Sequence, residues 1–73
     1  MLKLGLVGWR GMVGSVLMDR MRAEGDFNLF DNYFFTTSQA GLAAPACVNL
    51  KSDVLLDAYS IEALKEMDIV LTC

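Results

Sequence analysis

The sequence predicts an α/β fold in which a mostly parallel sheet is flanked by helices. An apolar run at 2–7 leads into a glycine-rich turn at 8–14, and that turn leads into an amphipathic segment at 13–22. Further apolar or aromatic stretches follow at 33–37, 54–58 and 68–73. The chain is 55% hydrophobic, which is typical of strands buried on both faces of a parallel sheet. This order of strand, turn and helix favours a partial Rossmann-type arrangement.

The first strand is expected at 2–7, which is mostly apolar. The helix at 13–22 gathers one set of apolar side chains on a single face, which we expect to pack on the sheet. That set is Val13, Val16, Leu17 and Met21. Met12 and Met18 lie beside this face and are expected to be ordinary packing residues. Gly25 suits the C-cap of the helix.

Segments of different composition follow the helix. The aromatic and β-branched residues at 33–37 predict the second strand, with 29–32 as the loop that leads into it. The small residues at 38–45 include a glycine and the single proline, which disfavour a helix. The stretch 47–53 has no clear periodicity and is expected to be a loop.

The C-terminal part predicts a further strand, helix and strand. A short third strand is expected at 54–58, and Ser60 suits the N-cap of a short helix at 61–67. The residues that share the apolar face of this helix are Ile61, Leu64 and Met67. The last stretch, 68–73, predicts another buried strand with no loop or helix after it. We therefore expect the chain to be the N-terminal part of a larger protein, with its sheet incomplete at the C-terminal end.

Composition and charge argue against several classes of protein. The six basic residues are scattered and the net charge is −3, which disfavours a nucleic-acid-binding surface. No segment approaches the ~20 apolar residues that cross a bilayer, and the N-terminus lacks the pattern of a signal peptide. Two cysteines without any histidine form neither a disulfide framework nor a zinc site. We therefore expect a cytoplasmic protein with free thiols and no metal.

The glycine-rich turn is the strongest functional signal in the sequence. We expect Gly8 to let the chain turn sharply off the strand, Gly11 to let the backbone approach a phosphate, and Gly14 to let the helix pack tightly on the first strand. The free N–H groups of the first helical turn would then face the anion. The spacing is G-x-x-G-x-x-G, whereas the usual dinucleotide fingerprint is G-x-G-x-x-G. A tight turn that binds nothing is the alternative.

The end of the second predicted strand favours NADP over NAD. An NAD-binding unit carries a carboxylate there for the ribose hydroxyls, whereas this chain has Thr36, Thr37, Ser38 and Gln39. Hydroxyls and N–H groups can donate to a 2′-phosphate, and Arg10 can form a bidentate pair with it. The alternative is that Thr36 is a buried strand residue, Ser38 belongs to a turn and Arg10 is solvated.

Trp9 and Cys73, near the predicted crevice, each have more than one interpretation. Trp9 either packs under the loop, which is the favoured interpretation, or shields the adenine. Cys73 ends the last predicted strand near the crevice, which raises the question of a nucleophile. No histidine is present to activate a thiol, so we expect both Cys47 and Cys73 to be plain thiols.

These residues resemble the start of the bacterial aspartate-semialdehyde dehydrogenases. The matching segments are Gly8-Trp9-Arg10-Gly11-Met12-Val13-Gly14-Ser15-Val16-Leu17-Met18, Phe34-Phe35-Thr36-Thr37-Ser38-Gln39, Ala43-Ala44-Pro45, Glu62-Ala63-Leu64-Lys65 and Asp68-Ile69-Val70-Leu71-Thr72-Cys73. They run across the whole chain in the family's order, and the similarity is weakest at 46–56.

The resemblance implies an NADP-dependent, homodimeric enzyme that reduces L-aspartyl 4-phosphate to L-aspartate 4-semialdehyde, for the synthesis of lysine, methionine and threonine. It implies that the cofactor phosphates are held at Arg10, Gly11, Met12 and Val13, next to Gly8. Thr37 and Ser38 would meet the adenosine-phosphate end. The cofactor-binding residues implied are therefore Gly8, Arg10, Gly11, Met12, Val13, Thr37 and Ser38.

The family's catalytic cysteine, which forms a thioester, and its histidine lie beyond this chain. Residues 1–73 would thus be the N-terminal part of an NADP-binding domain, without the substrate domain and without catalytic residues. Two alternatives stay open: a stand-alone, non-catalytic nucleotide-binding module, and the cofactor part of a related acyl-phosphate reductase such as N-acetyl-glutamyl-phosphate reductase.

Overall fold

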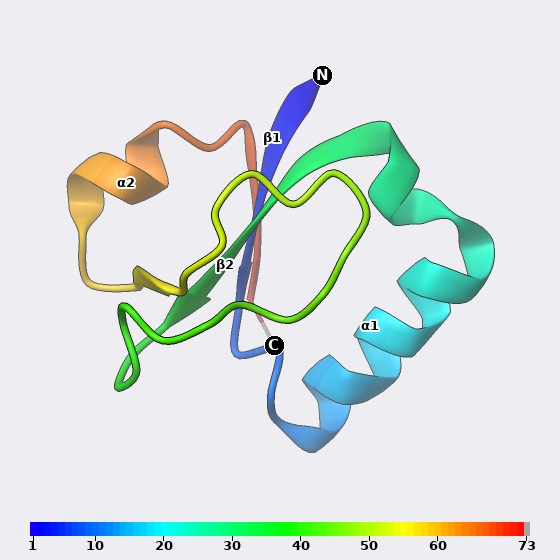
Figure 1. The fold of residues 1–73 in the computed structure, drawn as a ribbon, viewed down its shortest axis with the longest axis horizontal. Helices are drawn as coiled ribbons and strands as arrows, with labels where there is room; N and C mark the ends of the chain where they lie inside the picture. Colours follow the sequence, from blue (N-terminus) through cyan, green and yellow to red (C-terminus); the bar gives the residue numbers. More distant parts are fainter. Residues whose placement is uncertain (73) are drawn as a thin grey trace.

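The computed structural model describes residues 1–72. In chain order the elements are β1 (Leu2–Val7), α1 (Met12–Glu24), the 3-10 helix η1 (Asp26–Leu29), β2 (Phe30–Thr36), β3 (Leu56–Asp57), α2 (Ile61–Lys65) and β4 (Ile69–Thr72). The strands form one sheet in the order β3-β2-β1-β4, and each neighbouring pair is parallel. The helices α1 and α2 lie on opposite sides of this sheet (Figure 1). The predicted α/β fold is therefore confirmed.

The two central strands differ in how well the sequence predicted them. β1 has the predicted bounds, whereas β2 begins at Phe30, so the loop expected at 29–32 is wrong. The polar residues at the start of β2 concealed the strand. Asn32 is nevertheless 0% exposed, because its Nδ2 donates hydrogen bonds of 2.9 Å to the carbonyls of Phe27 and Val48. These bonds satisfy the donor side of the buried amide, while its Oδ1 has no hydrogen-bond partner among residues 1–72.

The buried face of α1 is only partly the predicted one. Val13 and Val16 are 72% and 61% exposed, whereas the predicted Met21 is buried together with Gly14 and Met18. The physical reason is that Gly14 lies against the turn after β1, which rotates the helix so that Met18 and Met21 face the sheet. Leu17 is half-buried, as expected. Met18 packs as predicted, whereas Met12 is 87% exposed and does not.

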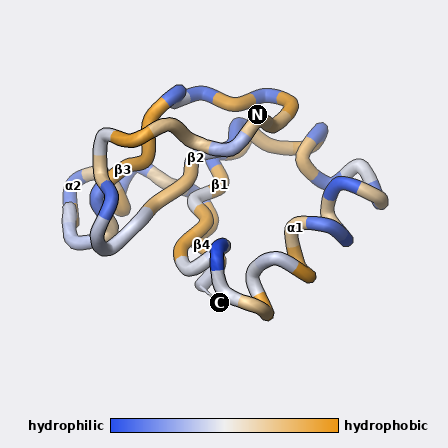
Figure 2. The backbone as a smooth tube through the Cα atoms, turned by 60° about the horizontal axis from the view of Figure 1, so that its bottom comes forward, coloured by the Kyte–Doolittle hydropathy of each residue, from blue (hydrophilic) through white to orange (hydrophobic). Residues whose placement is uncertain are grey.

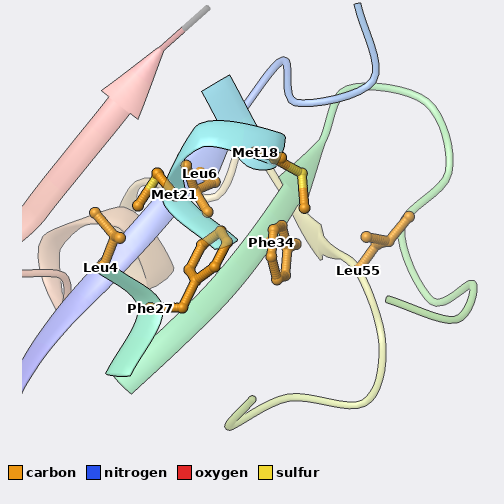
Figure 3. Packing of buried hydrophobic residues seen from close by; sticks show 7 residues of the cluster. All are labelled: Leu4, Leu6, Met18, Met21, Phe27, Phe34 and Leu55. Carbon is orange, nitrogen blue, oxygen red and sulfur yellow. The ribbon is translucent and has the colours of Figure 1, made fainter. Parts of the chain in front are cut away.

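The core fills the space between the sheet and α1. Figure 3 shows Leu4, Leu6 and Phe34 of the sheet beside residues from other elements. Those residues are Met18, Met21, Phe27 and Leu55. Both hydrophobic and hydrophilic residues occur along α1 in Figure 2, as expected for a helix with one face on the core. This packing holds the start of α1 against the carboxyl end of β1.

The long connection from β2 to β3 contains no helix. It runs back along β2, where Leu50 forms a parallel bridge with Asn32, and it closes on itself through an antiparallel bridge between Ala43 and Val54. The third strand is only Leu56–Asp57, shorter than the predicted 54–58. Its two residues pair with the end of β2, so the sheet is widest where β2 ends.

The last two elements are shorter and more exposed than predicted. Ser60 caps α2 as expected, since its side chain accepts a bond from the Ala63 N–H. The helix ends at Lys65 and not at 67, and Ile61 is 66% exposed, unlike the half-buried Leu64 and Met67. The predicted buried strand is β4, with alternating half-buried and exposed residues. Within residues 1–72 it pairs with β1 alone. Cys73 lies outside the described residues.

Candidate cofactor-binding site

The turn between β1 and α1 leaves backbone N–H groups open. Gly8 has a φ of +78°, in the left-handed region that suits glycine, and the chain leaves the sheet there. Gly11 is the N-cap of α1, and no side chain caps the helix. The first backbone bond at this end runs from the Ser15 N–H to the Gly11 carbonyl, at 2.8 Å. The N–H groups of Met12 and Val13 therefore have no acceptor within the helix and are available to an anion.

The glycines at 11 and 14 have different functions. A Cβ on Gly14 would collide with the Gly8 carbonyl and lie 2.6 Å from the Trp9 Cα. Gly14 thus permits close packing on the turn itself, and the prediction that it packs on the first strand is corrected. A Cβ on Gly11 would meet only the Gly8 oxygen, at an ordinary 3.7 Å. The fold does not require glycine at position 11, so its bare backbone is free for close approach by a bound molecule.

A second turn faces the first one. The Thr36 Oγ1 accepts bonds of 3.3 Å from the N–H groups of Ser38 and Gln39, which bend the chain directly after β2. Thr36 is half-buried, as in the structural alternative considered for it, while Thr37 and Ser38 are exposed. Between the two turns lies a cavity of about 430 Å³ lined by residues 7–11 and 35–39.

The cavity is electropositive. Of the residues that line it, Arg10 is charged and none is an aspartate or glutamate. The Arg10 guanidinium lies over the Trp9 ring, with its Cζ 4.8 Å from the ring centroid. The indole Nε1–H donates to the Phe35 carbonyl at 3.1 Å. Trp9 therefore packs within the site, and its predicted packing role is confirmed.

The structure brings most of the predicted cofactor-binding residues together. Gly8, Arg10, Gly11, Thr37 and Ser38 all line the cavity. Met12 and Val13 do not line it; they follow Gly11 directly, at the uncapped start of α1, with side chains 87% and 72% exposed. The cofactor role of all seven stays a prediction.

The lining residues missing from that predicted set are Val7, Trp9, Phe35, Thr36 and Gln39. Phe35 and Gln39 shape the site through their hydrogen bonds. The Phe35 carbonyl holds Trp9, and Gln39 contributes the second turn. The Gln39 Oε1 is buried without a hydrogen-bond partner among residues 1–72. Gln39 could have been predicted to line the site because it directly follows Thr37 and Ser38. No local sequence signal identifies Phe35 as a lining residue.

Cys47 lies apart from this cavity and has the properties of a plain thiol. Burial raises the pKa of the Cys47 thiol above its ordinary value of 9.0, and the nearby Arg22 offsets part of that effect. The thiol also donates a hydrogen bond to the Val48 carbonyl at 3.3 Å. A protonated, half-buried thiol is not an activated nucleophile. The prediction for Cys73 concerns a residue outside the described part of the chain.

Two comparisons agree with this geometry. Residues 3–73 match the family model described as semialdehyde dehydrogenase, NAD binding domain. The fold matches a solved structure of aspartate semialdehyde dehydrogenase from Francisella tularensis with a TM-score of 0.87 and 52% sequence identity. That match covers 100% of this chain and 20% of the other.

The match accounts for the features of the site. A domain that binds a nicotinamide dinucleotide needs open amides at the first helix of the sheet and a polar turn after the second strand. Both are present around the cavity at 7–11 and 35–39. The chain belongs to the semialdehyde dehydrogenase family, and its residues 3–73 match the NAD-binding domain of that family.

Proposed function

We propose that this chain is the cofactor-binding N-terminal part of an NADP-dependent aspartate-semialdehyde dehydrogenase. The 52% identity over the whole chain to the Francisella tularensis enzyme supports this assignment over a stand-alone binding module or a related acyl-phosphate reductase. The observation that carries the cofactor preference is the juxtaposition of Arg10 with Thr37 and Ser38 across one cavity without a carboxylate. An aspartate or glutamate in this place would repel a 2′-phosphate.

The chain's own residues suit the two charged parts of NADP. The backbone N–H groups of Met12 and Val13, at the positive end of the α1 dipole, suit the pyrophosphate, and the bare backbone at Gly11 lets it approach. The Arg10 guanidinium and the hydroxyls of Thr37 and Ser38 suit the 2′-phosphate. When bound, NADPH supplies the hydride that reduces an acyl group to an aldehyde.

The proposed reaction is the reduction of L-aspartyl 4-phosphate to L-aspartate 4-semialdehyde in the synthesis of lysine, methionine and threonine. The catalytic cysteine and histidine would come from the rest of the protein, because this chain spans 20% of the length of the Francisella tularensis structure. The complete enzyme would be a cytoplasmic homodimer. Within residues 1–72, no helix is long and apolar enough to cross a membrane.

An Arg10→Ala variant of the full-length enzyme tests the cofactor assignment. Dissociation constants for NADP and NAD are measured by isothermal titration calorimetry. The loss of one charge-assisted contact should weaken NADP by about ten- to a hundredfold, or about 1.5–3 kcal/mol, and leave NAD nearly unchanged.

The matched control for this experiment is Arg20→Ala. Arg20 is an exposed arginine on α1 that lines none of the cavities described here, so its loss should affect neither constant. Equal weakening of NADP and NAD by Arg10→Ala would contradict the proposed preference, because it would place Arg10 on the shared pyrophosphate.

A further inference from the structure

We propose that Trp9 is a positioning residue: it holds the Arg10 guanidinium at the cavity, so that cofactor binding depends on the indole through Arg10. This inference rests on the proposed function, since it assumes that Arg10 meets an anionic part of the dinucleotide. It assigns to Trp9 a role beyond the packing predicted for it.

The indole is fixed by two contacts with β2. Its Nε1–H donates to the carbonyl of Phe35 at 3.1 Å, and Phe35 is opposite Val7 in the last pair of the β1–β2 register. The side chain of Trp9 thus continues the connection between β1 and β2 after the backbone has turned away at Gly8. The ring also meets Phe34 edge to face, with centroids 5.5 Å apart and planes at 72°. Because Phe34 is 0% exposed, the core sets the tilt of the indole.

Arg10 in turn depends on the indole. Its Cζ lies 4.8 Å from the Trp9 centroid, within the range of a cation–π contact. No carboxylate among residues 1–72 lies within salt-bridge distance of Arg10, and the side chain is exposed. An exposed arginine without such support samples many rotamers, and that freedom is lost when it binds an anion. The Trp9 ring reduces this loss of conformational entropy, because it already restricts the guanidinium before the anion binds.

Arg10 also shares a hollow with a competing charge. Trp9 and Arg10 line this second, smaller hollow of about 280 Å³ on the α1 side, and Asp19 and Arg22 are on its wall. A guanidinium released from the ring could turn toward this carboxylate and away from Thr37 and Ser38. The stack on Trp9 therefore favours the orientation of Arg10 that the dinucleotide needs.

A double-mutant cycle in the full-length enzyme tests this inference. The variants are Trp9→Leu, Arg10→Ala and the double variant, and the readouts are the dissociation constants of NADP and NAD. Trp9→Leu should weaken NADP by about fivefold when Arg10 is present, and by less than about twofold when Arg10 is alanine. Trp9→Phe keeps an aromatic face without the N–H donor, so it should recover part of the loss. The control is Tyr59→Leu, because Tyr59 is an aromatic residue that is 74% exposed and lines neither hollow.

The outcomes separate a positioning role from a structural one. If Trp9 only supported the fold, its loss would weaken both cofactors by the same factor with or without Arg10, and that additivity would overturn the inference. If the Trp9→Leu variant does not fold, the same cycle is measured with Trp9→Phe. The inference then requires that the smaller effect of Trp9→Phe on the NADP dissociation constant also disappears in the Arg10→Ala background. The NADP preference is tested separately: it fails if Arg10→Ala affects NADP and NAD equally. The coupling of Trp9 to Arg10 is read on NADP, which Arg10→Ala weakens in either case.

Discussion

The polar groups at the two ends of β2 are in opposite environments, buried near its start and exposed beyond its end. Near its start, Asn32 is fully buried and donates to the carbonyls of Phe27 and Val48. Beyond its end, Thr37 and Ser38 are exposed and face a cavity of about 430 Å³ across from Arg10. The first end also borders a hollow of about 340 Å³, but this one is lined largely by apolar residues of the core and the long connection.

This difference indicates which polar groups stabilise the fold and which are available to bind a ligand. Bonded, buried polar groups stabilise the fold, because leaving them unpaired would be costly. Open amides and hydroxyls contribute little to folding and are available to a ligand. Substitution of Asn32 should therefore change stability without changing cofactor affinity, and substitution of Gly11 should do the reverse. Four predictions test that separation in the full-length enzyme, from the largest expected effect to the smallest.

Asn32→Ala should cause the largest loss of stability. It removes the donor to the carbonyls of Phe27 and Val48, of which the first bond is buried and the second part-buried, and it leaves a small cavity. We expect the free energy of unfolding to fall by about 3 kcal/mol, measured by urea denaturation, with the NADP dissociation constant unchanged under native conditions. Asn28→Ala, at an exposed asparagine of the same region, is the control. A loss below about 1 kcal/mol would mean that the Asn32 network contributes little.

Gly14→Ala should destabilise the turn from which the site is built. The new Cβ would lie 2.6 Å from the Trp9 Cα and 2.7 Å from its carbonyl carbon, and backbone atoms cannot yield as a flexible side chain would. Overpacking should lower the free energy of unfolding by about 3 kcal/mol, and the better helix propensity of alanine should offset about 1 kcal/mol of that loss. The expected net loss is about 2 kcal/mol in urea denaturation. Unchanged stability would show that α1 can shift away from the turn.

Gly11→Ala should weaken cofactor binding and leave the fold intact. The added methyl has only an ordinary 3.7 Å contact with the Gly8 oxygen, so the free energy of unfolding should change by less than about 0.5 kcal/mol. The same methyl occupies the space through which a phosphate would approach the backbone. We expect the dissociation constants of NADP and NAD to rise together by about tenfold, equivalent to about 1.4 kcal/mol. If both affinities survive the substitution, the pyrophosphate does not lie against Gly11.

The smallest effect concerns Cys47. Its pKa is raised above 9.0 by burial, so the neutral thiol contributes stability that is present below pH 9 and lost as the pH rises through the raised pKa. Alkylation by iodoacetamide, followed by peptide mass spectrometry, should show a midpoint above pH 9 for this residue. Cys47→Ser should lack the corresponding alkaline loss of stability. A midpoint below 9.0 would mean that Arg22 outweighs burial.

The sequence predicted the elements whose determinants are local. The apolar run of β1, Gly8 in the first turn and Ser60 before α2 all act on neighbouring residues, and each was placed correctly. Five of the predicted cofactor-binding residues line one cavity, because the carboxyl ends of adjacent parallel strands meet at one edge of the sheet. The start of β2 was missed because Asn32 looks like a loop residue until its distant partner, the Val48 carbonyl, is known.

The sequence by itself determined that a strand, a glycine turn and a helix follow one another, since glycine content and apolar periodicity act over a few residues. Only the tertiary structure decided which face of α1 is buried, because Gly14 must contact the backbone of the preceding turn before Met18 and Met21 can reach the sheet. It also decided the position of Trp9, whose hydrogen-bond acceptor, the Phe35 carbonyl, lies 26 residues away along the chain. A contact of that separation depends on strand pairing and leaves no local pattern.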